Sequence, residues 1–297
     1  GFVFYCGTIK LFTDKWLVFQ IIDSMINLIL LYRALDYFKS NRSFNIIVFL
    51  SMSGMIMFFD TLRNIKAILI FFISLKYVFK KQIVKYSLCC FSFHSSAILF
   101  FFAYPILNID ISKKFFLLCG VFVTIWAFVS RHILINLFLS LSSYLPNFIQ
   151  KAVNFYVLSE NGYSLSRFIT FGTLEKFITF IMICMNYEKL KKEKKDFLLI
   201  KIFFLYYVSY FTFFAFSEIS NRVSQLFIFC YWCLIPKIVK LQKKNSQANF
   251  AICIFIYCLL KMSLYNQSIQ RYENFLFGAS SFEERKEILS TFKLFED

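Results

Sequence analysis

The chain has 297 residues, of which 59% are hydrophobic and 22% aromatic, and its mean hydropathy is +0.64. Soluble proteins have roughly 45–50% apolar residues, so this composition excludes an ordinary soluble domain and predicts an integral membrane protein. The formal net charge of +16 would suggest nucleic-acid binding in a soluble protein. Here the lysines lie in short segments between apolar runs, where they set membrane topology, so we expect no nucleic-acid partner.

Apolar runs follow one another along the chain, and a helix that crosses a bilayer needs roughly 20 such residues. We expect transmembrane spans near 16–38, 44–60, 62–79, 86–106, 114–130, 171–188, 197–215, 223–240 and 248–264. The shorter apolar segment 132–147 is expected to be a further span or a half-helix that ends at Pro146. The predicted fold class is therefore an all-α, polytopic integral membrane protein of about nine to ten transmembrane helices, forming a single domain over 1–297.

Lysine-rich segments predict the orientation of these spans, because cytoplasmic loops carry an excess of Lys and Arg. The strongest such segment is KLKKEKK at 189–195, which we expect in the cytoplasm. The outer face is then expected to hold Asn108–Lys114, the external loop 142–170 and the polar tail 265–297. This arrangement requires 132–147 to cross or half-cross the membrane.

The segment FFDTLRNIKA, residues 58–67, carries charges into an otherwise apolar region. Asp60, Arg63 and Lys66 are spaced by three residues, which places them on one face of a helix. A charge held in a membrane has a partner by default. Two interpretations stay open: Arg63 pairs with Asp60 as a helix-packing device, or its planar fork binds a lipid-linked phosphate or diphosphate.

Two further segments place polar residues next to apolar runs. In SEISNRVSQLF, Glu218 and Arg222 are spaced by four residues, so Arg222 either pairs with Glu218 on a helix or binds a phosphate group. In CFSFHSSAILFF, His94 lies inside an expected span beside small serines that let a helix or a ligand approach. His94 could therefore be a general base or a phosphate ligand, or it could make a structural hydrogen bond.

Polar loops offer residues suited to sugars, because aromatic rings stack on sugar rings and amide or guanidinium groups bond hydroxyls. These residues are Tyr163 and Arg167 in NGYSLSRF, and Asn266 and Arg271 in YNQSIQRYEN. The sequence contains no phosphate-binding GxxxxGK[ST] loop and no Asp-x-Asp pair. We therefore expect no metal and no cofactor, and a transferred group that arrives already activated on a lipid carrier.

Residues 58–81, followed by KYSLCCFSFHSSAILFF, resemble the EpsG-like family of polysaccharide polymerases, which is related to Wzy-type O-antigen polymerases. The resemblance covers roughly 40–275. The family usually opens with one or two further helices and an outer-face Gly-x-Asp…Tyr segment, which we do not find, so we expect that part to be absent or diverged. The resemblance rests on Arg63, Asn64, Ala67, Lys80, Lys81, Phe93, His94, Ser96, Ala97, Glu218 and Arg222.

The resemblance implies an enzyme that joins oligosaccharide repeat units carried on undecaprenyl diphosphate, at the periplasmic face of the bacterial inner membrane. An acceptor hydroxyl attacks the anomeric carbon of the donor, and the lipid diphosphate leaves. The implied catalytic residues are Asp60, His94 and Glu218, and the implied diphosphate ligands are Arg63, Arg222 and Lys66.

The expected partners are the lipid-linked donor and acceptor, the bilayer, a chain-length regulator and a flippase. Two other functions remain open from the sequence. The chain could be a transporter or flippase of the same lipid-linked oligosaccharide, which would need arginines in a cavity but no base. It could also be a hydrophobic subunit of a membrane complex, which would need no such site.

Overall fold

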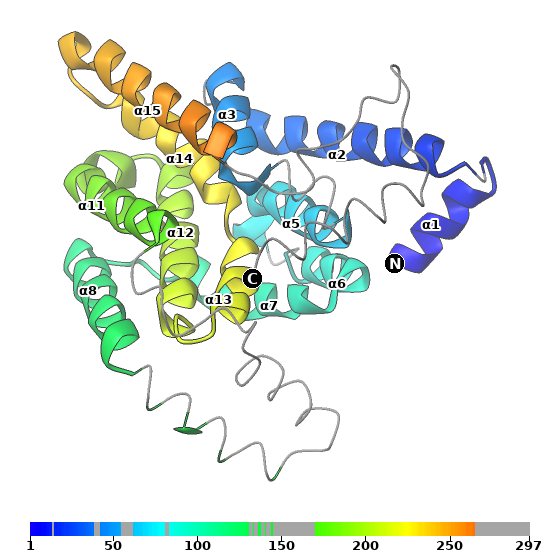
Figure 1. Ribbon diagram of the computed structural model, residues 1–297, viewed down its shortest axis with the longest axis horizontal. Coiled ribbons are helices and arrows are strands. Elements are labelled where there is room, and N and C mark those ends of the chain that lie inside the picture. Colours follow the sequence, from blue (N-terminus) through cyan, green and yellow to red (C-terminus); the bar gives the residue numbers. More distant parts are fainter. Residues whose placement is uncertain are drawn as a thin grey trace.

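The computed structural model describes residues 1–130 and 170–264, with gaps at 14, 39–41, 55–61 and 81–82, together with five single positions between 131 and 169. In this part of the chain every regular element is a helix (Figure 1), so the all-α fold class is confirmed. The α-helices are α1 (Phe2–Lys10), α2 (Trp16–Phe38), α3 (Arg42–Phe49), α5 (Leu62–Ser74), α6 (Ile83–Phe93), α7 (Leu99–Asn108), α8 (Lys113–Val129), α11 (Phe171–Lys191), α12 (Lys194–Thr212), α13 (Ser217–Gln225), α14 (Phe229–Lys240) and α15 (Lys244–Leu264).

Several predicted spans correspond to one uninterrupted helix each. These are the predicted spans that form α2, α8, α11, α12 and α15. Each is a long, mostly apolar run, which is the pattern expected of a helix. The predictions for 132–147, 142–170 and 265–297 fall almost entirely outside the described residues.

Four predicted spans are not single α-helices. The span 62–79 is formed by α5 and a 3-10 helix at Leu75–Lys80. The span 86–106 is divided into α6, a 3-10 helix at Ser95–Ile98 and α7, with the break at His94. The span 223–240 starts within α13 and bends by 65° into α14. After α3 the chain forms a π-helical turn, Leu50–Gly54, in which Ser53 has a φ of 62°. These breaks give the helix cluster several short helices where the sequence predicts long ones.

Few of the described helices are both long enough and apolar enough to cross a bilayer. Among the described residues, one helix, Val18–Phe38, is long and apolar enough to cross a membrane, and the bent pair Ile219–Gln225 and Phe229–Lys240 adds a second if it counts as one span. Helix α12 is 19 residues long but carries Lys194, Lys195, Asp196 and Lys201. The number of crossings predicted from the sequence therefore stays a prediction.

Aromatic side chains form the centre of the helix cluster. The rings of Phe71 and Phe100 stack with centroids 3.9 Å apart, and those of Phe72 and Phe229 at 4.4 Å. The ring of Phe227 lies edge-on to Phe100 at 5.9 Å. All five of these side chains are buried. Since burying an aromatic ring removes a large apolar area from solvent, this aromatic cluster joins α5, α7 and the start of α14 into one core.

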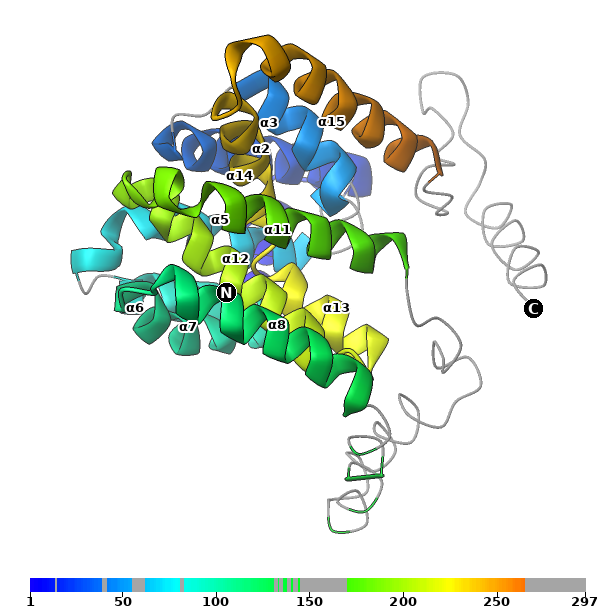
Figure 2. The same cartoon turned by 90° about the vertical axis from the view of Figure 1, so that its left-hand side faces the viewer.

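Helices α8 and α11 run antiparallel, and their pairing changes the predicted topology. The hydroxyl of Tyr187 donates to the carbonyl of Ile111 at 2.6 Å, and Lys191 pairs with Asp110 at 2.9 Å. Further along, the rings of Phe116 and Phe180 stack at 5.2 Å. The end of α11 therefore lies beside the start of α8 (Figures 1 and 2).

This pairing brings the lysine-rich segment 189–195 and residues 108–114 to the same end of the helix cluster. The prediction that these segments lie on opposite faces of the membrane was wrong. It relied on loop charge and required 132–147 to carry the chain across the membrane. In the structure, α11 returns along α8, so residues 130 and 170 also share one end.

Candidate functional site

The most buried charges of the described chain belong to Lys66 and Asp23. Lys66 lies in the second turn of α5 with a side chain 2% exposed, and Asp23 lies in α2 with a side chain 1% exposed. Their ammonium and carboxylate groups form an ion pair. Because an unpaired buried charge is strongly destabilising, each of the two residues requires the other, and the pair ties the start of α5 to α2.

Two more side chains complete the environment of the Asp23 carboxylate. The Tyr5 hydroxyl, from α1, donates to Oδ1 at 2.7 Å, and the Asn27 amide donates to Oδ2 at 2.9 Å. The Lys66 ammonium lies 4.7 Å from the centroid of the Tyr5 ring. Burial and the adjacent carboxylate raise the pKa of Tyr5 well above its ordinary value of 10.0. Tyr5 therefore keeps its proton and acts as a donor.

Asn27 also has an unused hydrogen-bonding atom. Its side chain is 0% exposed, and its Oδ1 has no hydrogen-bond partner among the described residues. Buried polar atoms are nearly always bonded, so this oxygen is an exception beside the charge pair.

A second polar group connects the first turn of α5 to the break at His94. His94 has an extended backbone, with φ −148° and ψ 132°, and its Nδ1 accepts from the Ser96 backbone N–H at 3.2 Å. Nδ1 also lies 2.6 Å from the Ser96 hydroxyl, which donates weakly to Asn64 Oδ1 at 3.4 Å. His94 thus caps the 3-10 helix Ser95–Ile98 and reaches α5 through Ser96.

The aromatic cluster places three segments that carry predicted site residues around one core. Lys66 precedes Phe71 in α5, His94 precedes Phe100 in α7, and Arg222 precedes Phe227, in each case by five or six residues. Contacts between Phe71, Phe100 and Phe227 then join these segments. The structure links His94, through Ser96, to Asn64, which lies two residues before Lys66 in α5. It places Arg222 in the last turn of α13, with an exposed side chain.

The remaining predicted site residues are described incompletely or lie outside the described residues. Arg63 follows Leu62 at the start of α5, and Glu218 lies in the first turn of α13, but only their backbones are described. The residues outside the described part of the chain are Asp60, Tyr163, Arg167, Asn266 and Arg271.

Sequence reasoning missed Tyr5, Asp23 and Asn27. A signal for Asp23 exists in QIIDSMINLIL, since an acid inside an apolar run is expected to face a partner. Asn27 follows it at a spacing of four, on the same helix face. Tyr5 carried no such signal, because its role depends on how α1 folds back on the core.

A partly buried charge pair lies between α11 and α15. Glu175 pairs with Lys261 and accepts from the Tyr257 hydroxyl at 2.6 Å. A cavity of about 140 Å³ adjoins it, lined by Glu175, Thr179, Tyr257 and seven apolar residues. Because the carboxylate already has two donors, we assign this cluster to helix packing. No three His, Cys, Asp or Glu side chains of the described chain gather as a metal site would require.

Comparisons with known proteins give one match. The model of the EpsG family matches residues 1–276, which extends the predicted resemblance from about 40 to the first residue and includes Tyr5 and Asp23. No curated protein and no solved structure matches the chain. The chain therefore belongs to the EpsG family, whose members are membrane proteins associated with polysaccharide biosynthesis.

Proposed function

We propose that the chain is a glycosyltransferase that polymerises oligosaccharide repeat units carried on undecaprenyl diphosphate. The observation that carries this proposal is the EpsG family match over 1–276, which includes every described residue of the site around α5. We further propose that it acts in the bacterial inner membrane, with its site open to the periplasm, beside a flippase and a chain-length regulator.

In the proposed reaction, an acceptor hydroxyl oxygen forms a bond to the anomeric carbon of the donor. The bond between that carbon and the diphosphate oxygen breaks, the electron pair leaves with the lipid diphosphate, and the hydroxyl proton passes to a base. Negative charge grows on the leaving oxygen, so fixed cations beside it lower the barrier. Arg63 and Arg222 are proposed to provide these cations, since a guanidinium can bind two phosphate oxygens at once.

The buried pair of Lys66 and Asp23 supports this assignment because it fixes the position of α5 close to Arg63. It anchors α5 one turn after Arg63, and a group that stabilises a transition state must be held in place before the reaction. Asp23 neutralises Lys66 at close range, so we propose that Lys66 contributes to diphosphate binding chiefly by fixing this turn.

The base is proposed to be His94, because the chain His94–Ser96–Asn64 reaches the same turn of α5. Asp60 and Glu218 are the other proposed acids or bases, as they neighbour Arg63 and Arg222 in the sequence. The proposed sugar contacts are Tyr163, Arg167, Asn266 and Arg271.

Deletion of the gene tests the proposed function directly. A strain without the polymerase should still export repeat units, so we expect carriers or surface glycolipids capped with a single unit and no longer polymer, measured by gel and mass spectrometry. Restoring the gene should restore the polymer. If deletion instead leaves lipid-linked units trapped in the cytoplasm with nothing on the surface, a flippase function replaces this proposal.

A further inference from the structure

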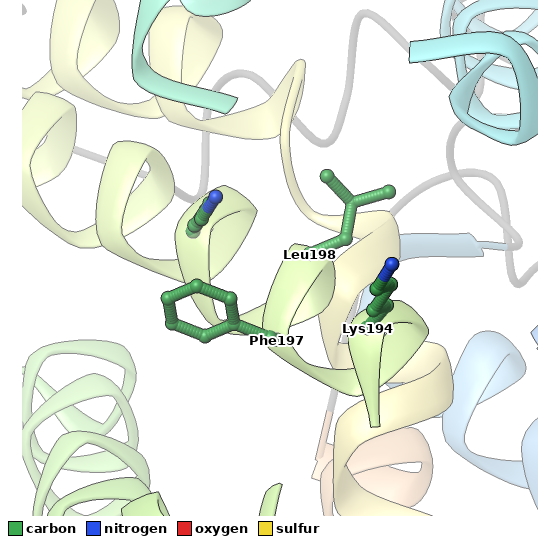
Figure 3. Close-up of a pocket in the computed structure, with 4 residues that line it drawn as sticks. Lys194, Phe197 and Leu198 are labelled. Atoms are coloured by element: carbon green, nitrogen blue, oxygen red, sulfur yellow. The ribbon is translucent and has the colours of Figure 1, made fainter. Parts of the chain in front are cut away.

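A cavity of about 200 Å³ lies along the first turns of α12. The described residues that line it are Lys194, Phe197, Leu198 and Lys201 (Figure 3), whose spacing of three, four and seven places them on one face of the helix. The neighbouring Lys195 donates to the carbonyl of Tyr37 at 2.8 Å. Tyr37 is 14 residues beyond Asp23 in α2, or roughly 21 Å along the helix, so this cavity is distinct from the site around α5.

Lys201 is a buried cation that has no described carboxylate in direct contact with it. Its side chain is 5% exposed. The ammonium donates to the carbonyl of Leu107 at 2.9 Å and lies 4.5 Å from the centroid of the Phe197 ring. No carboxylate of the described chain lies within 4 Å of it. An ammonium has three donors, and a buried charge is costly unless it is paired.

Two acids close to the lining residues in the sequence or in space are already paired with other lysines. Asp110 is 72% exposed and pairs with Lys191 at 2.9 Å. Asp196, in the first turn of α12, pairs with Lys237. The described lining of the cavity contains two lysines and no acidic residue, and this excess of positive charge favours an anionic ligand.

A simpler explanation is that these lysines only extend from apolar surface to water. That explanation suits Lys194, which is exposed, because lysines commonly bury the stem and keep the ammonium in water. It does not suit Lys201, which is buried and whose ammonium donates a hydrogen bond to the carbonyl of Leu107.

We propose that this cavity binds the phosphate group of an amphiphilic molecule. Lys201 meets the phosphate at the buried end and Lys194 at the exposed end, because the ammonium group of lysine is a common phosphate ligand. Phe197 and Leu198 contact the apolar part. Anionic lipids also concentrate beside lysine-rich segments at a membrane surface, and the run 189–195 leads directly into α12.

The test uses the purified full chain in neutral-detergent micelles. Short-chain phosphatidic acid and phosphatidylcholine are titrated and the bound lipid is counted by native mass spectrometry. Phosphatidic acid should bind at least tenfold more tightly. Lys201→Met, which keeps the length of the side chain, should weaken that binding about tenfold, the worth of one charge-assisted hydrogen bond. Lys194→Met should weaken it severalfold.

Lys192→Met is the matched control, because Lys192 is exposed and does not line the cavity. It should change binding less than twofold. Equal losses in all three variants, or equal binding of the two lipids, would overturn the proposal. If Lys201→Met does not fold, the comparison of Lys194→Met with Lys192→Met still shows whether a lysine that lines the cavity contributes to lipid binding.

Inorganic phosphate is then added as a competitor. Displacement of the lipid identifies free phosphate as a sufficient ligand, and no displacement identifies the lipid phosphate.

Discussion

The ion pair of Lys66 and Asp23 allows a direct test at the scale of single residues. Lys66→Met leaves the Asp23 carboxylate buried without its cation, so we expect a loss of about 3–5 kcal/mol in the free energy of unfolding. Removing both charges with Lys66→Met and Asp23→Asn should recover part of that loss. Thermal unfolding in detergent and the amount of protein in the membrane measure the effect.

The pair of Lys191 and Asp110 is the control, because these side chains are 33% and 72% exposed. Exposed pairs contribute about 0–1 kcal/mol, so Lys191→Met should be nearly neutral. If Lys66→Met costs no more than Lys191→Met, the pair around Asp23 is not buried as the structure shows it.

His94 combines a structural role that is visible with a catalytic role that is proposed. Its Nδ1 accepts the Ser96 backbone N–H, and an Asn side chain also accepts such a bond at the start of a helix. His94→Asn should therefore keep the protein abundant, while His94→Ala lowers its abundance. Both variants should lose about a hundredfold or more of polymer formation, since neither retains the base. Full activity in His94→Asn would make His94 a structural cap only.

At the scale of elements, long apolar runs were predicted well and the breaks between short helices were not. Sequence rules treat proline as a point of interruption, yet Pro105 and Pro236 lie inside α7 and α14. The break at His94 contains neither Gly nor Pro. It is stabilised by bonds from Ser96 to His94 and to Asn64, 32 residues away. A local pattern cannot reveal a break that depends on such a distant partner.

The contact between α8 and α11 depends on Gly120. A Cβ atom at this position would overlap the ring of Phe180. That ring is held between Phe116 at 5.2 Å and Tyr207 at 4.7 Å, so it has little room to move. Gly120→Ala gains helix propensity, but overpacking should outweigh it and destabilise the protein by about 1–3 kcal/mol.

Thermal unfolding of Gly120→Ala measures that loss. The second-site change Phe180→Leu, which removes the ring, should restore part of the stability in the double variant. A Gly120→Ala protein more stable than the parent would show that α8 and α11 do not approach as closely as described.

For the whole molecule, the family predicted from the sequence is confirmed, and Lys66 and His94 stay candidate site residues. These two residues could be selected as candidates because they stand out in apolar runs and belong to a recognisable motif. Their surroundings were not found, since Asp23 is 43 residues from Lys66 and Tyr5 belongs to another helix. Loop charge likewise failed to predict that 108–114 and 189–195 share one end, because α8 and α11 pair through buried contacts.

We propose that the start of α5 holds the donor diphosphate. The most direct test is the length and amount of polymer made by strains complemented with Arg63 variants. Arg63→Ala should be as abundant in the membrane as the parent and should lose about a hundredfold or more of polymer formation, since one such donor contributes about 2.7–4 kcal/mol. Arg63→Lys should also be impaired, because it keeps the charge but not the fork. The control Arg33→Ala, an exposed position in α2, should make polymer of normal length. Long polymer from an abundant Arg63→Ala protein would contradict the account.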